Sequence, residues 1–271
     1  MRDPHPAAKR SGEWIETQLD PSAPSLDPSQ HRFLARQAIF DRMGEIYGYE
    51  LLFRFGLDNH FTGDSDAATR TMVDNWLLHG FEGVIGHLPS FLNCTREALV
   101  EGLVTLLPKT RTVLELLETV TPDEEVVSAC RRLKQIGYGI ALDDFQFSKK
   151  MEPLVELADY IKLDFRLPEK QRKKTLRQLE GCGAKLVAEK VETEKELKCA
   201  FEEGFELFQG YFFDPPRIFA RRRTSIDAMQ YRKIRKAMKT SWLKTPKQAG
   251  FECHCGLYQP SPDAASWQQC G

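Results

Sequence analysis

The stretch GIALDDFQFSKKMEPLVELADYIKLD, residues 139–164, contains two apolar runs of strand length, and each of them ends in aspartate. Residues 139–143 form the first run and residues 160–164 form the second, with a longer amphipathic segment between them. Alternation of strand and amphipathic helix is typical of a parallel sheet whose strands are joined by crossover helices. This stretch therefore predicts one repeating unit of an α/β fold.

The same unit recurs on both sides of this stretch. Further strands are predicted at 90–93, 112–117, 185–189 and 206–209, and a hairpin at 34–40 and 46–53 around residues 41–44. Helices are predicted at 67–78 after the cap Asp66, at 122–135 with Thr121 as cap, Pro122 as first residue and Gly137 after the last turn, and at 194–203. Seven or eight such units suit a closed (β/α)8 TIM-like barrel better than a doubly wound open sheet, which remains the structural alternative.

Polar side chains stand at the ends of these apolar strands at regular intervals. They are Glu50, Asn93, Glu115, Asp143, Asp144, Lys162, Asp164, Glu189 and Gln209. The carboxyl ends of the strands of such a barrel converge on one mouth, where active sites lie. Any one of these residues taken alone is more typical of a structural ion pair or a helix cap. Their recurrence, once per unit, is what predicts a common site.

The chemistry of this set favours divalent cations. A carboxylate in an apolar strand is costly to bury unless it is paired or bound to metal. Four or five carboxylates with one amide and one lysine cannot neutralise one another, and oxygen-rich sets prefer Mg²⁺, Mn²⁺ or Ca²⁺ to Zn²⁺. Two such ions could ionise a water, orient it and stabilise the leaving oxygen of a phosphoester. The residues therefore predict metal-dependent hydrolysis of a phosphoester.

Charge and hydropathy exclude several other classes. The formal net charge is −1, so no basic field favours a nucleic-acid polymer as partner. No apolar run approaches the roughly 18 residues of a membrane span, and the first residues lack the apolar core of a signal peptide. Glycine patterns for dinucleotides or P-loops are missing from the sequence. We therefore expect a cytoplasmic location and no membrane partner.

Both ends of the chain differ from the middle. Residues 1–32 are rich in Pro, Ser and Asp and are expected to be disordered, residues 33–218 to form the barrel, and residues 219–271 to form a basic helix and a tail. The basic segment 217–247 is expected to be a charged helix that is either solvated or binds an anionic or protein partner. Cys253, His254, Cys255 and Cys270 lack a second CxxC pair, which favours free thiols over a metal site.

Eight ordered segments between residues 35 and 216 resemble the EAL domain family of cyclic di-GMP phosphodiesterases. They are RQAIFDR (36–42), YGYELLFR (47–54), FLN (91–93), LELLE (114–118), LDDF (142–145), IKLD (161–164), VAEKVET (187–193) and FQGYFFDPP (208–216). The segments look most similar to the branch in which an HDOD domain follows the EAL domain. Because the residues after 216 are too few for that second domain, we expect the chain to be the EAL part alone.

The resemblance implies a barrel of the EAL type that hydrolyses cyclic di-GMP to linear pGpG in bacterial second-messenger signalling, with two Mg²⁺ or Mn²⁺ ions. It implies a homodimer as well. The metal ligands would be Glu50, Asn93, Glu115, Asp143, Asp144 and Glu189. Lys162 would orient the attacking water, with Glu50 and Glu189 as the other catalytic residues, and Glu118 would brace the loop after Asp144. Gln37, Arg54 and Gln209 would meet the nucleotide or support its site.

Three departures from the family pattern leave a second interpretation open. The signature Glu-Ala-Leu is Glu50-Leu51-Leu52 here, and the glycine-containing loop after the aspartate pair is Phe145-Gln146-Phe147-Ser148-Lys149-Lys150. The glycine of the family's EGVE segment is Lys190. Loss of glycine removes backbone freedom. The alternative is therefore an inactive EAL module that binds cyclic di-GMP or a protein partner, and the site chemistry also permits a different phosphoester.

Overall fold

The computed structural model describes residues 14–17, 31–54, 69, 73 and 80–222 of the 271-residue chain. Eight strands in this part close into a barrel in the order β2-β3-β4-β5-β6-β7-β8-β9, because β9 also pairs with β2. They are β2 (His31–Asp41), β3 (Ile46–Arg54), β4 (Ser90–Cys94), β5 (Thr112–Leu116), β6 (Gly139–Leu142), β7 (Tyr160–Asp164), β8 (Lys185–Glu189) and β9 (Leu207–Phe208). The predicted TIM-like barrel is confirmed, and the open sheet is excluded.

One strand runs against the others. The strands from β3 to β9 pair in parallel, whereas β2 is antiparallel to both of its neighbours in the barrel, β3 and β9. This follows from the predicted hairpin, since residues 42–45 turn the chain directly from β2 into β3 without a crossover helix. Asp41 stabilises the turn, because its Oδ1 accepts hydrogen bonds from the backbone N–H groups of Met43 and Glu45.

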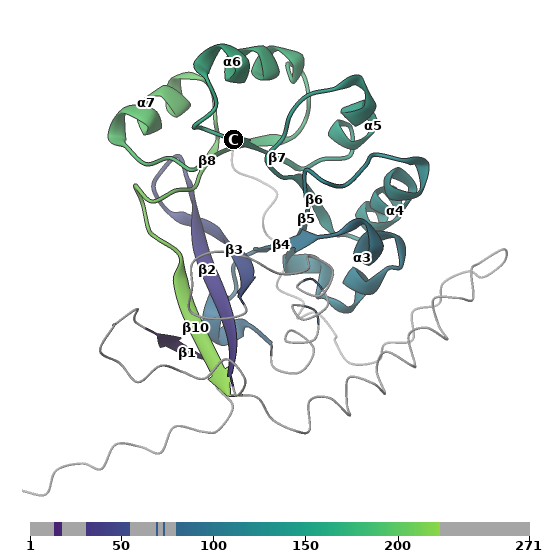
Figure 1. The fold of residues 1–271 in the computed structure, drawn as a ribbon, viewed down its shortest axis with the longest axis vertical. Coiled ribbons are helices and arrows are strands. Elements are labelled where there is room, and N and C mark those ends of the chain that lie inside the picture. The colour runs from purple at the N-terminus through teal and green to yellow at the C-terminus, as the bar shows by residue number, and fades with distance from the viewer. Residues whose placement is uncertain (1–13, 18–30, 55–68, 70–72, 74–79, 223–271) are drawn as a thin grey trace, which may run out of the picture. The chain divides into compact units, whose positions relative to one another are not determined.

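Helices cover the outside of the barrel. They are α2 (Glu82–Ile85), α3 (Arg96–Val100), α4 (Glu124–Gln135), α5 (Glu152–Val155), α6 (Glu169–Gln178) and α7 (Glu194–Glu202), with 3-10 turns at Leu103–Leu106, Lys109–Arg111 and Lys149–Met151. In Figure 1 the helices α3 to α7 follow one another in an arc around the strands. Their buried faces pack on the strands and form the main apolar core. No helix among these described elements is long and apolar enough to cross a membrane.

A layer of apolar side chains fills the barrel below the site. It consists of Ile39, Phe91, Val113, Ala141, Val187 and Leu207, flanked by Tyr47 and Tyr160. Successive side chains of a strand point to opposite faces, so residues two apart share a face. Because Phe91, Val113 and Val187 point into the barrel, the residues two positions further along each strand also point inward. These residues are Asn93, Glu115 and Glu189. The apolar layer fills the barrel and leaves the polar residues at its mouth.

The predicted start of one helix is wrong. Helix α4 begins at Glu124 with Asp123 as its cap, not at Pro122 with Thr121. The Oδ1 atom of Asp123 accepts a hydrogen bond of 2.9 Å from the N–H of Val126, and the same carboxylate pairs with Arg96. Aspartate is also a better helix cap than threonine. The end of the helix was predicted correctly, since Gly137 follows it with φ of 104°.

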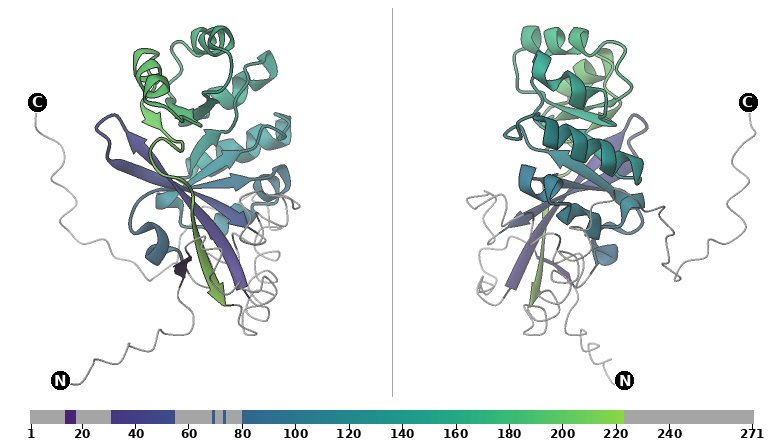
Figure 2. Two further views of the ribbon diagram at one scale, coloured as in Figure 1. Left: turned by 60° about the vertical axis from the view of Figure 1, so that its left-hand side comes forward. Right: turned by 90° about the vertical axis from the view of Figure 1, so that its right-hand side faces the viewer.

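The first residues of the basic segment are a strand, which corrects the predicted helix. Strand β10 (Arg217–Arg222) pairs antiparallel with β2 and with β1 (Ile15–Thr17), as Figure 2 shows for β10 and β2. Its centre, residues 218–220, is apolar and buried, and these contacts with the sheet outweigh the charge of the flanking arginines. Strand β1 also departs from the disorder expected for 1–32, and so does the start of β2 at His31.

Several predictions fall on parts that the structure does not describe. Of the helix predicted at 67–78, only Thr69 and Val73 are described, and both are helical. Residues 223–271, with the rest of the basic segment and the Cys and His cluster, lie outside the described residues. The backbone of Arg54 ends β3, but its side chain also lies outside them.

Candidate active site

Lys162 on β7 is the centre of the polar cluster at the barrel mouth. Its Nζ atom lies 2.7 Å from Glu189 Oε1, 2.8 Å from Glu115 Oε1, 3.1 Å from Asp143 Oδ1 and 3.2 Å from Glu50 Oε2. These carboxylates come from β8, β5, the end of β6 and β3. Lys162 and Glu115 are fully buried, and Glu50 and Glu189 nearly so. Residues predicted from four separate strand ends thus meet at one ammonium group.

Two glutamines complete one side of the cluster. The Nε2 group of Gln209 donates to Glu50 Oε2 at 2.7 Å and to Gln37 Oε1 at 3.2 Å. Gln37 faces Glu50 across the β2–β3 pair. Gln209 is held close to β8 because Gly210 follows it, and a Cβ atom at Gly210 would lie 2.1 Å from the carbonyl oxygen of Val191. Gln209 therefore orients the carboxylate of Glu50.

Burial dominates the electrostatics of the cluster. Burial alone would lower the pKa of Lys162, but the surrounding carboxylates outweigh it and hold that pKa well above its usual value. Burial raises the pKa of Glu115 well above its usual range. It raises the pKa of Glu189 to about 8, against the opposing charge of Lys162 and with help from Asp143. One ammonium does not compensate four carboxylates, so the cluster favours additional positive charge.

Several oxygen atoms in the cluster are buried and accept no hydrogen bond. They are Asn93 Oδ1, both carboxylate oxygens of Glu115, Glu189 Oε2 and Gln209 Oε1. For Glu115 the contact with Lys162 is an ion pair whose geometry is not that of a hydrogen bond. Buried polar atoms without partners are rare, and hard divalent cations take such oxygen ligands. The donor set at the mouth fits Mg²⁺, Mn²⁺ or Ca²⁺.

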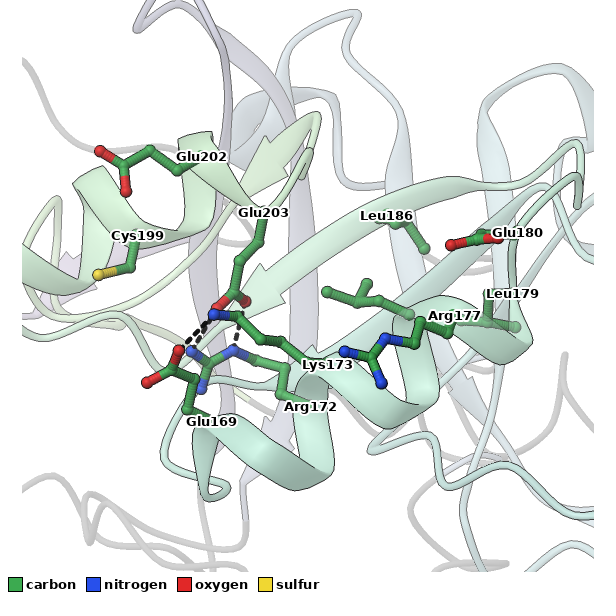
Figure 3. Close-up of a pocket in the computed structure, with 11 residues that line it drawn as sticks. Glu169, Arg172, Lys173, Arg177, Leu179, Glu180, Leu186, Cys199, Glu202 and Glu203 are labelled. Atoms are coloured by element: carbon green, nitrogen blue, oxygen red, sulfur yellow. Dashed lines mark hydrogen bonds and ion pairs between the residues drawn. The ribbon is translucent and has the colours of Figure 1, made fainter.

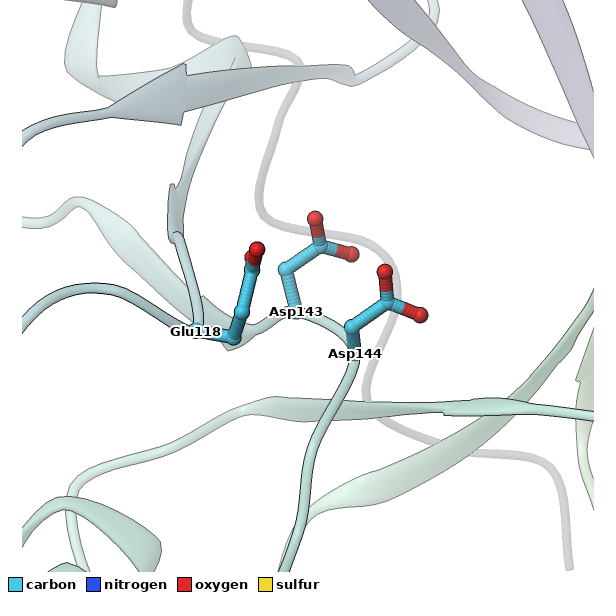
Figure 4. Close-up of side chains that lie close together, drawn as sticks. All are labelled: Glu118, Asp143 and Asp144. Carbon is cyan, nitrogen blue, oxygen red and sulfur yellow. The ribbon is translucent and has the colours of Figure 1, made fainter. Parts of the chain in front are cut away.

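A second group of carboxylates lies at the edge of the cluster. Oxygen atoms of Glu118, Asp143 and Asp144 all lie within 4.8 Å of one another, and Figure 4 shows their carboxylates directed to the same region. Glu118 is exposed, whereas the two aspartates are half-buried. Asp144 has a φ of 41°, in the left-handed region. Asp143 therefore belongs to both groups, because it contacts Lys162 and also lies close to Glu118 and Asp144.

Lys190 reaches the site from the end of β8. Its Nζ atom lies 2.7 Å from Asp144 Oδ1 and 2.9 Å from Asp164 Oδ2, and its φ is 57°. Burial would lower the pKa of Lys190, but these two carboxylates outweigh it and raise that pKa. Burial would raise the pKa of Asp164, but hydrogen bonds from Arg166 and Lys190 outweigh it and lower that pKa to about 2.

A cavity of about 470 Å³ opens over this cluster. Most of the predicted residues line it, namely Gln37, Glu50, Asn93, Asp143, Asp144, Glu189 and Gln209. Glu115 and Lys162 lie beneath it, fully buried. Arg166, Lys190 and Tyr211 are among the lining residues that sequence reasoning did not assign to the site. Their signal was their position directly after predicted strand ends, in IKLDFR, VAEK and FQGY.

A separate cavity of about 530 Å³ lies between α6 and α7. Figure 3 shows Arg172 and Glu203 meeting across it, with Arg172 Nε 2.6 Å from Glu203 Oε2. Arg172 also donates to the carbonyl oxygens of Phe165 and Leu167, and its guanidinium stacks over the Phe165 ring at 3.8 Å. All of these contacts join neighbouring elements, so this pair is structural.

The comparisons with known proteins agree with this geometry. The model of the EAL domain matches residues 89–216. YuxH of Bacillus subtilis, described as uncharacterized, is 39% identical over 196 residues, which cover 69% of this chain and 48% of YuxH. The cyclic di-GMP phosphodiesterase CdgJ of Vibrio cholerae is 36% identical over 208 residues, which cover 74% of this chain and 48% of CdgJ.

Solved structures share the fold. The Klebsiella pneumoniae BlrP1 complex with calcium and cyclic di-GMP has a TM-score of 0.57 at 22% identity, covering 78% of this chain and 62% of that chain. This chain spans about half the length of the curated relatives that it matches. The family model identifies residues 89–216 of this chain as an EAL domain, and the closed barrel agrees with that assignment.

Proposed function

We propose that this site hydrolyses cyclic di-GMP to linear pGpG with the help of bound Mg²⁺ or Mn²⁺. The carrying observation is the set of buried oxygen atoms without hydrogen-bond partners around Lys162, beneath a cavity lined by carboxylates. Such a set is stable in a folded protein when a hard cation completes it. The names of CdgJ and of the BlrP1 complex support cyclic di-GMP as the ligand.

Glu50, Asn93, Glu115 and Asp143 would hold one ion, Glu189 would bind that ion or its water, and Asp144 would hold the second ion that the family resemblance implies. When bound, such an ion supplies acidity to a coordinated water and polarises a phosphoryl oxygen. The reaction adds one water across one P–O bond of the ring, which opens cyclic di-GMP to pGpG. Lys162 offsets the negative charge that gathers in this step, and it holds four carboxylates in place.

The remaining residues have supporting roles in this proposal. Gln209 orients Glu50 through a 2.7 Å hydrogen bond, and Gln37 accepts from the same amide group. Arg166 adds a partly exposed guanidinium to the cavity wall. A planar guanidinium suits phosphate oxygens. Glu118 would support the loop after Asp144, as the sequence predicts.

The test is release of pGpG from cyclic di-GMP by the purified chain in Mn²⁺ or Mg²⁺. We expect pGpG to form only with metal, and to be lost in Glu50→Ala. Glu156→Gln, which changes an exposed carboxylate at the end of α5, is the matched control and should keep the activity. Circular dichroism establishes that each variant is folded.

Two other outcomes would overturn the proposal. Saturable binding of cyclic di-GMP without pGpG would make the domain a receptor, the alternative that the altered loop raised. If the chain neither bound nor hydrolysed cyclic di-GMP, this nucleotide would be rejected as the ligand. Hydrolysis of other phosphoesters would then be tested with the same variants.

A further inference from the structure

Lys190 ties together the ends of three successive strands of the barrel. Asp144 follows β6, Asp164 ends β7, and Lys190 itself comes directly after β8. The ammonium lies 2.7 Å from Asp144 and 2.9 Å from Asp164, and the lysine side chain is 34% exposed. A cation is therefore held at the outer edge of the site by the chain itself.

The backbone at Lys190 is unfavourable for a lysine. A φ of 57° is in the left-handed region, where a side chain with a Cβ atom is disfavoured and glycine is not. Residues persist in such conformations where the surrounding structure determines them, and these residues cluster at functional sites. In this left-handed conformation the side chain of Lys190 reaches Asp144 and Asp164, and the two ion pairs offset the cost of the backbone conformation.

The two lysines divide the carboxylates of the site between them. Lys162 contacts the inner carboxylates, where Glu115 and Asn93 still offer oxygen atoms without partners. Lys190 contacts the outer aspartates, Asp144 and Asp164. A divalent cation at Asp144 would meet a fixed positive charge within a few ångströms, and like charges at that distance repel each other.

We propose that the ammonium of Lys190 takes the place of a second divalent ion at Asp144, so that this site binds one divalent ion rather than two. The inference rests on the proposed function for its first ion, at Glu50, Asn93, Glu115 and Asp143. It replaces the two ions that the family resemblance implies. In this arrangement Asp143 is a ligand of the one ion, and Asp144 is the anchor of the lysine.

The test counts bound Mn²⁺ on the full chain by equilibrium dialysis with elemental analysis, and by electron paramagnetic resonance. Wild type should bind about one Mn²⁺ with the spectrum of an isolated ion. Lys190→Gly relieves the backbone and Lys190→Met removes only the charge. Both should bind about two Mn²⁺ and show the spectrum of a spin-coupled pair. Lys195→Met, at an exposed lysine on α7, should stay at one.

Two results would overturn the inference. One is two coupled ions in wild type, which would mean that Asp144 recruits an ion beside Glu118 and Asp143 in spite of Lys190. The other is a single ion in both Lys190 variants. The ion count does not depend on turnover, so it is separable from pGpG release. One ion with no hydrolysis keeps the inference and rejects the function, whereas two ions with hydrolysis do the reverse.

Discussion

The ammonium of Lys162 lies 2.8 Å from a carboxylate oxygen of Glu115, and both side chains are completely removed from solvent. Three further carboxylates share this one lysine. Burial of charge is costly even when the charges are paired, and a cluster with excess carboxylates is costlier still. The barrel therefore keeps at its mouth an arrangement that a bound cation would stabilise.

Replacement of Lys162 by methionine should destabilise the metal-free protein by about 3–5 kcal/mol, because four carboxylates lose their buried counter-charge. Mn²⁺ should recover part of that loss, since it supplies positive charge to the same oxygen atoms. Urea unfolding with and without Mn²⁺ measures both effects. Lys173→Met, at an exposed pair on α6, should leave unfolding nearly unchanged. Equal unfolding of Lys162→Met and wild type would reject this account.

The change Glu115→Gln should move stability and metal affinity in opposite directions. Glutamine keeps the shape and removes a fully buried charge whose pKa burial already raises, so the metal-free protein should unfold no more easily than wild type. Mn²⁺ affinity should fall by at least about 10–100-fold, which is the loss typical when only a residue that hydrogen-bonds to a metal ligand is changed. Calorimetric titration with Mn²⁺ and urea unfolding give the two readings. A variant that loses stability but keeps its affinity would show that Glu115 is structural.

Arg172→Met should cost about 3–5 kcal/mol of unfolding free energy, because it leaves Glu203 buried and unpaired. The double variant with Glu203→Met should recover much of the loss, since two apolar side chains of similar size can replace a buried pair. Thermal or urea unfolding of the two single variants and the double variant measures the coupling. Rates of pGpG release at saturating metal should stay unchanged, and a large fall would connect this pair to the site.

Two cysteines should resist alkylation in the folded protein. Cys94 and Cys130 are buried, and burial raises the pKa of Cys130 to about 12 and that of Cys94 further. Thiolate is the reactive form, so at pH 8 only about one Cys130 in ten thousand is reactive. Cys182 and Cys199 are half-buried and should react first among the four described cysteines. Peptide mass spectrometry after iodoacetamide resolves each site, and unfolded protein provides the control in which all react.

Much of the fold follows from local pattern. The strands β7 and β8 have the predicted bounds, and β4 and β5 differ from their predicted bounds by one residue at one end. Apolar runs bounded by polar residues are strong signals because strands of a barrel are buried on both faces. Position in the repeat is enough to predict that Glu115, Lys162 and Glu189 share one mouth, because each of them stands on the inner face near the end of its strand.

Other features depend on contacts between distant segments. The arginine-rich residues 217–222 carry a charge pattern that favours a helix, but pairing with β2 and β1 makes them a strand. Asp123 caps α4 in place of Thr121, and it also pairs with Arg96, which lies 27 residues earlier. Both features involve contacts with residues far away in the sequence, which local periodicity cannot predict.

The amino-acid sequence by itself determined the order of the eight barrel strands and the polar residue at each strand end. Periods of two and of 3.6 residues are local properties, and they need no knowledge of the partner. The tertiary structure determined which carboxylates share Lys162, and it alone showed that Lys190 reaches Asp144 and Asp164. Distances between side chains on different strands are set by closure of the barrel, which no single segment encodes.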